Sequence, residues 1–103
     1  MDKSIWVVDD DESIRWVLEK GLADSGMDVQ TFDSANKVIK KLETENPQLI
    51  LTDIRMPGPS GIDLLDKVKE LRPDIPVIIM TAHSDLDSAV ESYEHGAWEY
   101  LPK

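Results

Sequence analysis

Cysteine is absent from this 103-residue sequence, and basic residues and long apolar runs are scarce. The lack of cysteine excludes disulfide bonds and thiolate chemistry. The 11 Lys and Arg residues stand against 21 Asp and Glu, and a net charge of −10 argues against direct binding to nucleic acid or an anionic membrane. No apolar stretch approaches the length of a membrane span, and the N-terminal Met-Asp-Lys-Ser is not typical of a signal peptide. We therefore expect a soluble, cytoplasmic domain.

What the sequence does contain is a regular alternation of short apolar runs and helical stripes. The apolar runs predict five strands, at Ile5–Val8, Asp28–Phe32, Leu49–Asp53, Val77–Thr81 and Trp98–Leu101. Between them, apolar residues recur at helical spacing in four segments, which predicts four helices. Alternating strands and helices imply parallel pairing through right-handed crossovers. The expected fold is α/β: a doubly wound, five-stranded parallel sheet of order 2-1-3-4-5.

The helix boundaries carry recognisable stop and cap residues. Gly26 and Gly96 follow the first and fourth helical segments, and Ser34 and Ser60 are placed to cap the second and third. Asp63, three residues after Ser60, completes a capping-box pattern. The apolar stripes that we expect on the first, third and fourth helices are Ile14, Val17, Leu18 and Leu22; Leu64, Leu65, Val68 and Leu71; and Leu86, Ala89, Val90 and Tyr93.

No helix is predicted after the fifth strand, although a doubly wound sheet needs helices on both faces. The first helix is alone on its side of the predicted sheet, so part of that face is expected to be bare. We therefore interpret residues 1–103 as one domain, truncated at its C-terminus and lacking a last helix.

Polar residues stand at the ends of four predicted strands. Asp9, Asp10 and Asp11 follow the first strand; the third ends at Asp53, the fourth at Thr81, and Lys103 follows the fifth. In an open α/β sheet, ligands bind at the carboxyl ends of the strands, so these residues are expected at one rim. Crowded carboxylates repel each other unless a cation neutralises them, and oxygen ligands suit Mg²⁺. Aspartate is also a known nucleophile for phosphorus, which predicts phosphoryl transfer to Asp53.

Each of these residues also has a simpler interpretation. Asp10 or Asp11 is suited to cap the first helix, and Asp53 to form the turn before Met-Pro-Gly. Thr81 is β-branched at a strand end, where a structural role is common. A lone C-terminal Lys103 is most often solvated. The functional interpretation depends on finding the groups together.

The combination of motifs resembles a two-component response-regulator receiver domain. The resemblance covers the whole chain and is carried by Val-Val-Asp-Asp at 7–10, by Asp53 with Met56-Pro57 and Gly61, by Thr81-Ala82 and by Lys103. Within that family the chain is similar to the receivers of the nitrogen regulatory protein C (NtrC) group. This narrower similarity is carried by residues 13–18, 53–58, 80–87 and 100–103.

The resemblance implies a role for each matching residue. Asp53 accepts a phosphoryl group from a sensor histidine kinase, and Mg²⁺ is held by Asp53, Asp10 and the Arg55 carbonyl, with Asp9 assisting. Thr81 and Lys103 contact the phosphoryl group. Tyr100 moves inward as Thr81 shifts on phosphorylation. The output surface lies on the fourth helix. The candidates for that surface are Leu86, Val90 and Tyr93.

The resemblance also implies partners. NtrC-like proteins carry a σ54-activating AAA+ ATPase and a DNA-binding module, neither of which is within these residues. The domain itself is therefore expected to act as a phosphorylation switch and a homodimerising unit. It is not expected to act as an enzyme on external substrates, to bind DNA or to contact a membrane.

Three other functions fit the sequence less well than this one. An aspartyl-phosphate phosphatase of similar topology usually has a second Asp two residues after the nucleophile, where this chain has Arg55. A flavodoxin-like cofactor binder needs a phosphate-cradling loop after the first strand, where three aspartates would repel phosphate. A receiver that is never phosphorylated and only dimerises is the remaining alternative.

Overall fold

The computed structural model describes residues 4–81 and 86–102, with the side chains of Leu86, Ser88, Ala89 and Pro102 outside that description. Lys103 likewise lies outside the described residues. The elements in chain order are β1 (Ser4–Val8), α1 (Glu12–Asp24), β2 (Asp28–Phe32), α2 (Ala35–Lys41), β3 (Leu49–Asp53), α3 (Gly61–Leu71), β4 (Val77–Thr81), α4 (Leu86–Glu94) and β5 (Glu99–Pro102).

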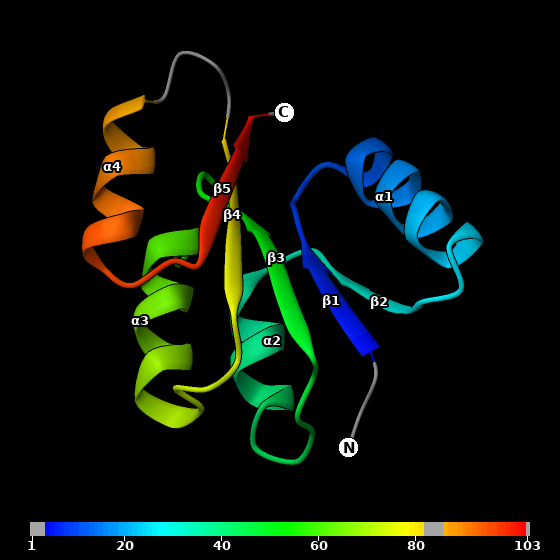
Figure 1. The fold of residues 1–103 in the computed structure, drawn as a ribbon, viewed down its shortest axis with the longest axis horizontal. Helices are drawn as coiled ribbons and strands as arrows, with labels where there is room; N and C mark the ends of the chain where they lie inside the picture. The colour runs from blue at the N-terminus through cyan, green and yellow to red at the C-terminus, as the bar shows by residue number, and fades with distance from the viewer. Residues whose placement is uncertain (1–3, 82–85, 103) are drawn as a thin grey trace.

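The five strands form one parallel sheet of order β2-β1-β3-β4-β5, which confirms the predicted fold. Helices α2, α3 and α4 lie on one face of the sheet and α1 lies on the other (Figure 1). Because all strands run the same way, their carboxyl ends meet at one edge of the sheet. That edge is where the sequence places the candidate site.

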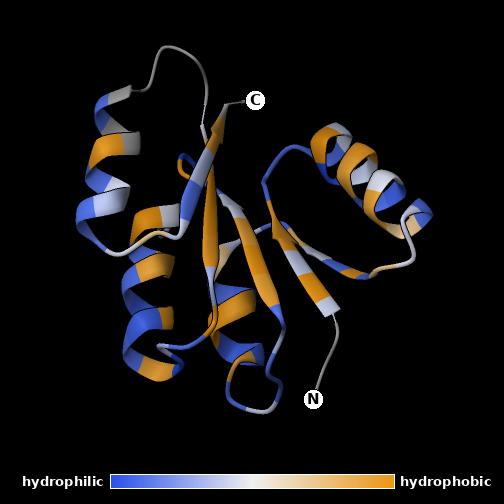
Figure 2. Ribbon diagram, viewed as in Figure 1, coloured by the Kyte–Doolittle hydropathy of each residue, from blue (hydrophilic) through white to orange (hydrophobic). Residues whose placement is uncertain are grey.

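The larger core lies between the sheet and helices α2 and α3. Apolar residues follow the central strands and the side of α3 that faces them (Figure 2). Trp6 of β1 is completely buried there and packs its ring against Phe32, with centroids 5.2 Å apart. Leu64, Leu65 and Val68 of α3 are also completely buried, as predicted, whereas Leu71 of the same predicted stripe is 38% exposed at the last residue of the helix. A smaller cluster on the α1 face contains Ile5, Val7, Leu51 and Met80.

Helix α1 covers its face less completely than its apolar stripe predicted. No residue of α1 is buried, and Val17, predicted to point inward, is 58% exposed. Leu18 and Leu22 do pack against the smaller cluster. The exposure of Val17 follows from the position of α1, because no second helix among the described residues lies beside it on that face (Figure 1).

The helix caps follow the sequence with one exception. Ser60 and Asp63 form the predicted capping box at the start of α3. Gly26 and Gly96 have positive φ angles, 85° and 97°, which glycine adopts without strain. Ser34 occupies the N-cap position of α2, but its side chain makes no capping hydrogen bond.

Within residues 4–81 and 86–102, none of the helices combines the length and the apolar character needed to cross a bilayer.

Candidate functional site

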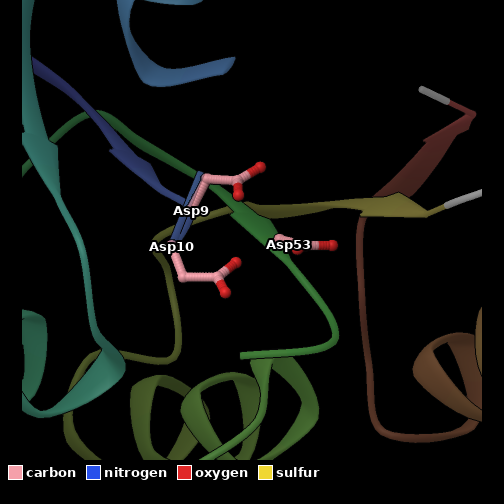
Figure 3. A group of neighbouring side chains, drawn as sticks. All are labelled: Asp9, Asp10 and Asp53. Atoms are coloured by element: carbon pink, nitrogen blue, oxygen red, sulfur yellow. The ribbon is translucent and has the colours of Figure 1, made fainter. Parts of the chain in front are cut away.

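Three carboxylates meet at the carboxyl ends of two neighbouring strands. Asp9 and Asp10 directly follow β1, and Asp53 is the last residue of β3. The two strands are paired in parallel, with Val8 opposite Thr52, so both chains reach the edge at the same level. All three side chains project from the strand ends toward the same side (Figure 3). The sequence prediction that separate strand tips bring these groups together is therefore confirmed.

The three residues are close enough to share one cation. Each offers a carboxylate oxygen, and these oxygens lie within 4.8 Å of one another. Asp9 and Asp53 are buried and Asp10 is exposed, so the cluster opens to solvent on the Asp10 side. Hard oxygen ligands of this kind suit Mg²⁺, which keeps several waters and takes few protein carboxylates. The donor set thus fits a magnesium ion.

Backbone hydrogen bonds orient the two buried carboxylates. The Ile54 amide donates to Oδ1 of Asp53 at 2.9 Å, and the Asp11 amide donates to Oδ1 of Asp9 at 2.9 Å. The Thr52 hydroxyl donates to the carbonyl oxygen of Asp53 at 3.0 Å. Because one oxygen of each carboxylate is engaged by a neighbouring amide, the rotation of each group is restricted.

Asp11 has a structural role that separates it from the cluster. It is the N-cap of α1, and its Oδ1 accepts from the amides of Ser13 at 2.8 Å and Ile14 at 3.4 Å. The capping alternative left open for Asp10 and Asp11 therefore applies to Asp11. Asp10 joins Asp9 and Asp53 instead.

The start of α3 presses directly against the backbone of Asp53. The Gly61 amide donates to the carbonyl oxygen of Ile54 at 2.8 Å. A Cβ atom at Gly61 would lie only 2.1 Å from the Asp53 carbonyl oxygen and 2.9 Å from Cα of Ile54. Since both neighbours are backbone atoms, no side chain fits at this position without moving the site.

Of the other predicted site residues, the structure describes Thr81 and Arg55. Thr81 ends β4, next to β3, and is 3% exposed; the register pairs Asp53 with Met80, one residue before it. Arg55 is exposed in the loop after β3 and lines an open cleft of about 540 Å³, together with Glu91 of α4. Lys103 lies outside the described residues, so its predicted contact with the phosphoryl group stays a prediction.

Among the predicted switch and output residues, Tyr93 lies on α4 and Tyr100 on β5, whereas the side chain of Leu86 lies outside the described part of the structure. The rings of Tyr93 and Tyr100 meet edge to face with centroids 5.6 Å apart. The Tyr93 hydroxyl donates to a carboxylate oxygen of Glu99, and this bond raises the pKa of Tyr93 and lowers that of Glu99. Val90 is 51% and Tyr93 43% exposed. The α4 stripe therefore includes residues that face solvent, as an output surface requires.

A histidine connects the end of α4 to α3. Nδ1 of His95 lies 2.6 Å from Oδ1 of Asp66, and Nε2 lies 3.9 Å from a Glu91 oxygen. The hydrogen bond to Asp66 is the main cause that raises the pKa of His95 above its ordinary 6.5, and the charges of Asp66, Glu91 and Glu94 add to it. The protonated imidazolium thus holds the last turn of α4 against α3.

This contact predicts a pH-dependent stability. Because the pKa of His95 is raised in the folded chain, its contribution is complete below pH 6.5 and is lost as pH rises through the raised value. We expect Asp66→Asn to bring the pKa of His95 back toward 6.5 in an NMR titration. The exposed Asp74→Asn should leave that pKa unchanged and serves as the control. An unaltered His95 titration in the Asp66 variant would contradict the assignment.

Sequence reasoning missed two residues at the site. Gly61 appears in the sequence only as part of a motif, and its steric role required knowing that α3 starts against Asp53. Arg15 appeared only within residues 13–18, yet its Nη1 donates to the Asp9 carbonyl oxygen at 2.6 Å. The available signal was an arginine in the first turn of the helix that follows the acidic loop.

Comparison with known proteins is consistent with this geometry. Residues 5–103 match the model of the response regulator receiver domain. The chain is 56% identical over 98 residues to the DNA-binding transcriptional regulator NtrC of Klebsiella pneumoniae, covering 95% of this chain and 21% of that protein. The chain thus spans about a fifth of the length of such curated relatives.

Solved structures resemble the fold closely. NtrX from Brucella abortus superimposes with a TM-score of 0.92 at 30% identity, covering 100% of this chain and 23% of that one. Response regulator TrrA from Thermotoga maritima, solved in complex with Mg²⁺–BeF, superimposes with a TM-score of 0.87 at 34% identity, covering 98% of this chain and 86% of that one.

Proposed function

This chain belongs to the response regulator receiver domain family, and from that premise we propose that it is a switch controlled by phosphorylation of Asp53. Receivers are signalling modules, so the proposal concerns one self-directed reaction and no external substrate. The observation that carries it is the cluster of Asp9, Asp10 and Asp53 within 4.8 Å, with Asp53 buried at the end of a central strand.

The proposed reaction transfers a phosphoryl group from a histidine nitrogen to a carboxylate oxygen of Asp53. A carboxylate oxygen of Asp53 attacks the phosphorus of a phosphohistidine on a sensor kinase, the P–N bond breaks, and the histidine leaves. Water later attacks the same phosphorus, which releases phosphate and restores the carboxylate. Both steps occur at Asp53 alone.

The neighbouring residues supply positioning and charge neutralisation. Asp9, Asp10, Asp53 and the carbonyl oxygen of Arg55 are the proposed ligands of Mg²⁺. A bound ion neutralises the crowded carboxylates and the negative charge on the phosphoryl oxygens. We propose that the Thr81 hydroxyl donates to one phosphoryl oxygen. Lys103 is proposed to pair with another.

The output is proposed to run through the contact of α4 and β5. Movement of the Thr81 hydroxyl toward the phosphoryl group leaves space at the end of β4, and Tyr100 moves inward. Because Tyr93 packs against Tyr100 and bonds to Glu99, α4 is repositioned by that movement. The surface that changes includes Leu86, Val90 and Tyr93.

The partners follow from the relatives. We propose that a sensor histidine kinase phosphorylates this domain in the cytoplasm. In the full-length protein the domain is proposed to control an attached σ54-dependent AAA+ activator for nitrogen regulation. Self-association is proposed on the exposed apolar residues of α4 and β5, which include Val90, Tyr93 and Leu101. We propose that the DNA-binding module of the full-length protein, and not this domain, contacts DNA.

A phosphodonor assay tests the proposal directly. With acetyl phosphate and Mg²⁺, intact-mass spectrometry is expected to show a gain of one phosphoryl group. Chelating the Mg²⁺ with EDTA should prevent the gain, because the carboxylates then repel the incoming phosphoryl oxygens. A chain that gains no mass with Mg²⁺ present, or gains as much with EDTA, would contradict the proposed function.

A further inference from the structure

Arg15 of α1 reaches back to the loop that carries the acidic cluster. Its Nη1 donates to the carbonyl oxygen of Asp9 at 2.6 Å, across a sequence separation of six residues. On the other side, the Asp9 amide donates to the carbonyl oxygen of Phe32 at the end of β2 at 3.0 Å. The backbone of Asp9 is therefore held from both sides, by β2 and by α1.

The peptide plane that Arg15 holds also sets the direction of Asp10. The carbonyl group of Asp9 and the amide group of Asp10 belong to one planar unit. Asp9 is buried and its carboxylate is fixed by the Asp11 amide, whereas Asp10 is exposed and gains little from packing. Fixing this plane therefore restrains the backbone from which the Asp10 carboxylate reaches the cluster.

The positive charge of Arg15 weakens cation binding at the acidic cluster, whereas its hydrogen bond to Asp9 favours it. The guanidinium is close enough to Asp33 to contribute, after the larger effect of Lys37, to lowering the pKa of that carboxyl. The same positive charge disfavours a divalent cation at the neighbouring cluster. The Debye length falls to about 4 Å at 0.5 M salt, so this repulsion is screened while the hydrogen bond remains.

We propose that Arg15 is a positioning residue for the cation site, which it orders through the Asp9–Asp10 peptide without touching the ion. This inference rests on the proposed function, because it requires that the cluster bind Mg²⁺. Residues that hydrogen-bond a metal ligand directly commonly change metal affinity by about 10–100-fold when they are removed; Arg15 acts one bond further out, through the backbone, so we expect the lower end of that range.

The test is a calorimetric Mg²⁺ titration of the whole chain in 0.5 M KCl. We expect Arg15→Gln to bind Mg²⁺ about tenfold more weakly than the unmodified chain, and Arg15→Lys, which keeps one donor and the charge, to lose about threefold. Arg72→Gln is the matched control. Its Nη2 donates to the carbonyl oxygen of Leu42 at 3.1 Å, at the far end of α3 from the site, so it removes the same charge and the same kind of bond.

A second measurement does not depend on the metal. In the absence of Mg²⁺, hydrogen exchange at the amides of Asp10 and Asp11 should be faster in Arg15→Gln than in Arg72→Gln, because only the first variant frees that peptide. The inference is overturned if Arg15→Gln binds Mg²⁺ as tightly as the unmodified chain. It is also overturned if Arg72→Gln loses as much Mg²⁺ affinity as Arg15→Gln does. If Arg15→Gln fails to fold by circular dichroism, an unchanged affinity in Arg15→Lys overturns it instead. Failure of the unmodified chain to bind Mg²⁺ would count against the proposed function itself.

Discussion

Asp53→Asn is expected to remove phosphorylation completely while leaving the fold intact. The amide of asparagine lacks the anionic oxygen that attacks phosphorus, and it carries one fewer charge for the cation. In the unmodified chain the Ile54 amide donates to Oδ1 of Asp53 at 2.9 Å, and the side-chain oxygen of asparagine can accept the same bond. Asparagine also has nearly the same volume as aspartate. Intact-mass spectrometry after treatment with acetyl phosphate and Mg²⁺ should therefore show only the unmodified mass.

The control for this variant is Asp74→Asn. Asp74 is exposed, so its substitution changes the net charge equally without touching the site. This variant should gain one phosphoryl group as the unmodified chain does. Phosphorylation that persists in Asp53→Asn would place the acceptor elsewhere and would refute the assignment of Asp53.

Gly61→Ala is expected to damage both stability and the site. The added Cβ would lie 2.1 Å from the carbonyl oxygen of Asp53, a backbone atom that cannot rotate away. Either α3 or the end of β3 must move, and overpacking of this kind costs about 3 kcal/mol. We expect a correspondingly lower urea midpoint, and weaker Mg²⁺ binding because Asp53 is displaced.

A second glycine provides the control. Gly21 lies within α1, where an added Cβ meets nothing within 4 Å. Gly21→Ala should instead stabilise the chain by about 0.5–1 kcal/mol, since alanine is the better helix former. Equal urea midpoints for Gly61→Ala and the unmodified chain would show that the start of α3 is looser than its contacts indicate.

The sheet and the acidic cluster were predictable because both follow from local patterns. Buried parallel strands require continuous apolar runs, and Leu49–Asp53 shows such a run ending in a carboxylate. The predicted strand order then brought Asp9, Asp10 and Asp53 to one edge. The capping box of Ser60 and Asp63 is likewise a short-range pattern that the sequence contains in full.

What the sequence did not reveal depends on how elements pack. Val17 fits the apolar stripe of α1, but helical spacing does not say whether a neighbouring helix covers that stripe. The steric role of Gly61 depends on the distance between α3 and β3, and the hydrogen bond of Arg15 depends on the angle at which α1 leaves the loop. His95 and Asp66 come from separate helices, so their pairing is a tertiary contact without a spacing rule.

The placement of the buried carboxylates at the ends of two different strands has a consequence for the stability of the chain against unfolding. Asp9 and Asp53 come together only when β1 and β3 are paired, so the unfolded chain has no such cluster. An ion held there binds the folded state alone, and each tenfold excess over its dissociation constant adds about 1.4 kcal/mol to the free energy of unfolding. Bound magnesium would then make the chain more resistant to proteases, and removal of the ion would make it easier to cleave.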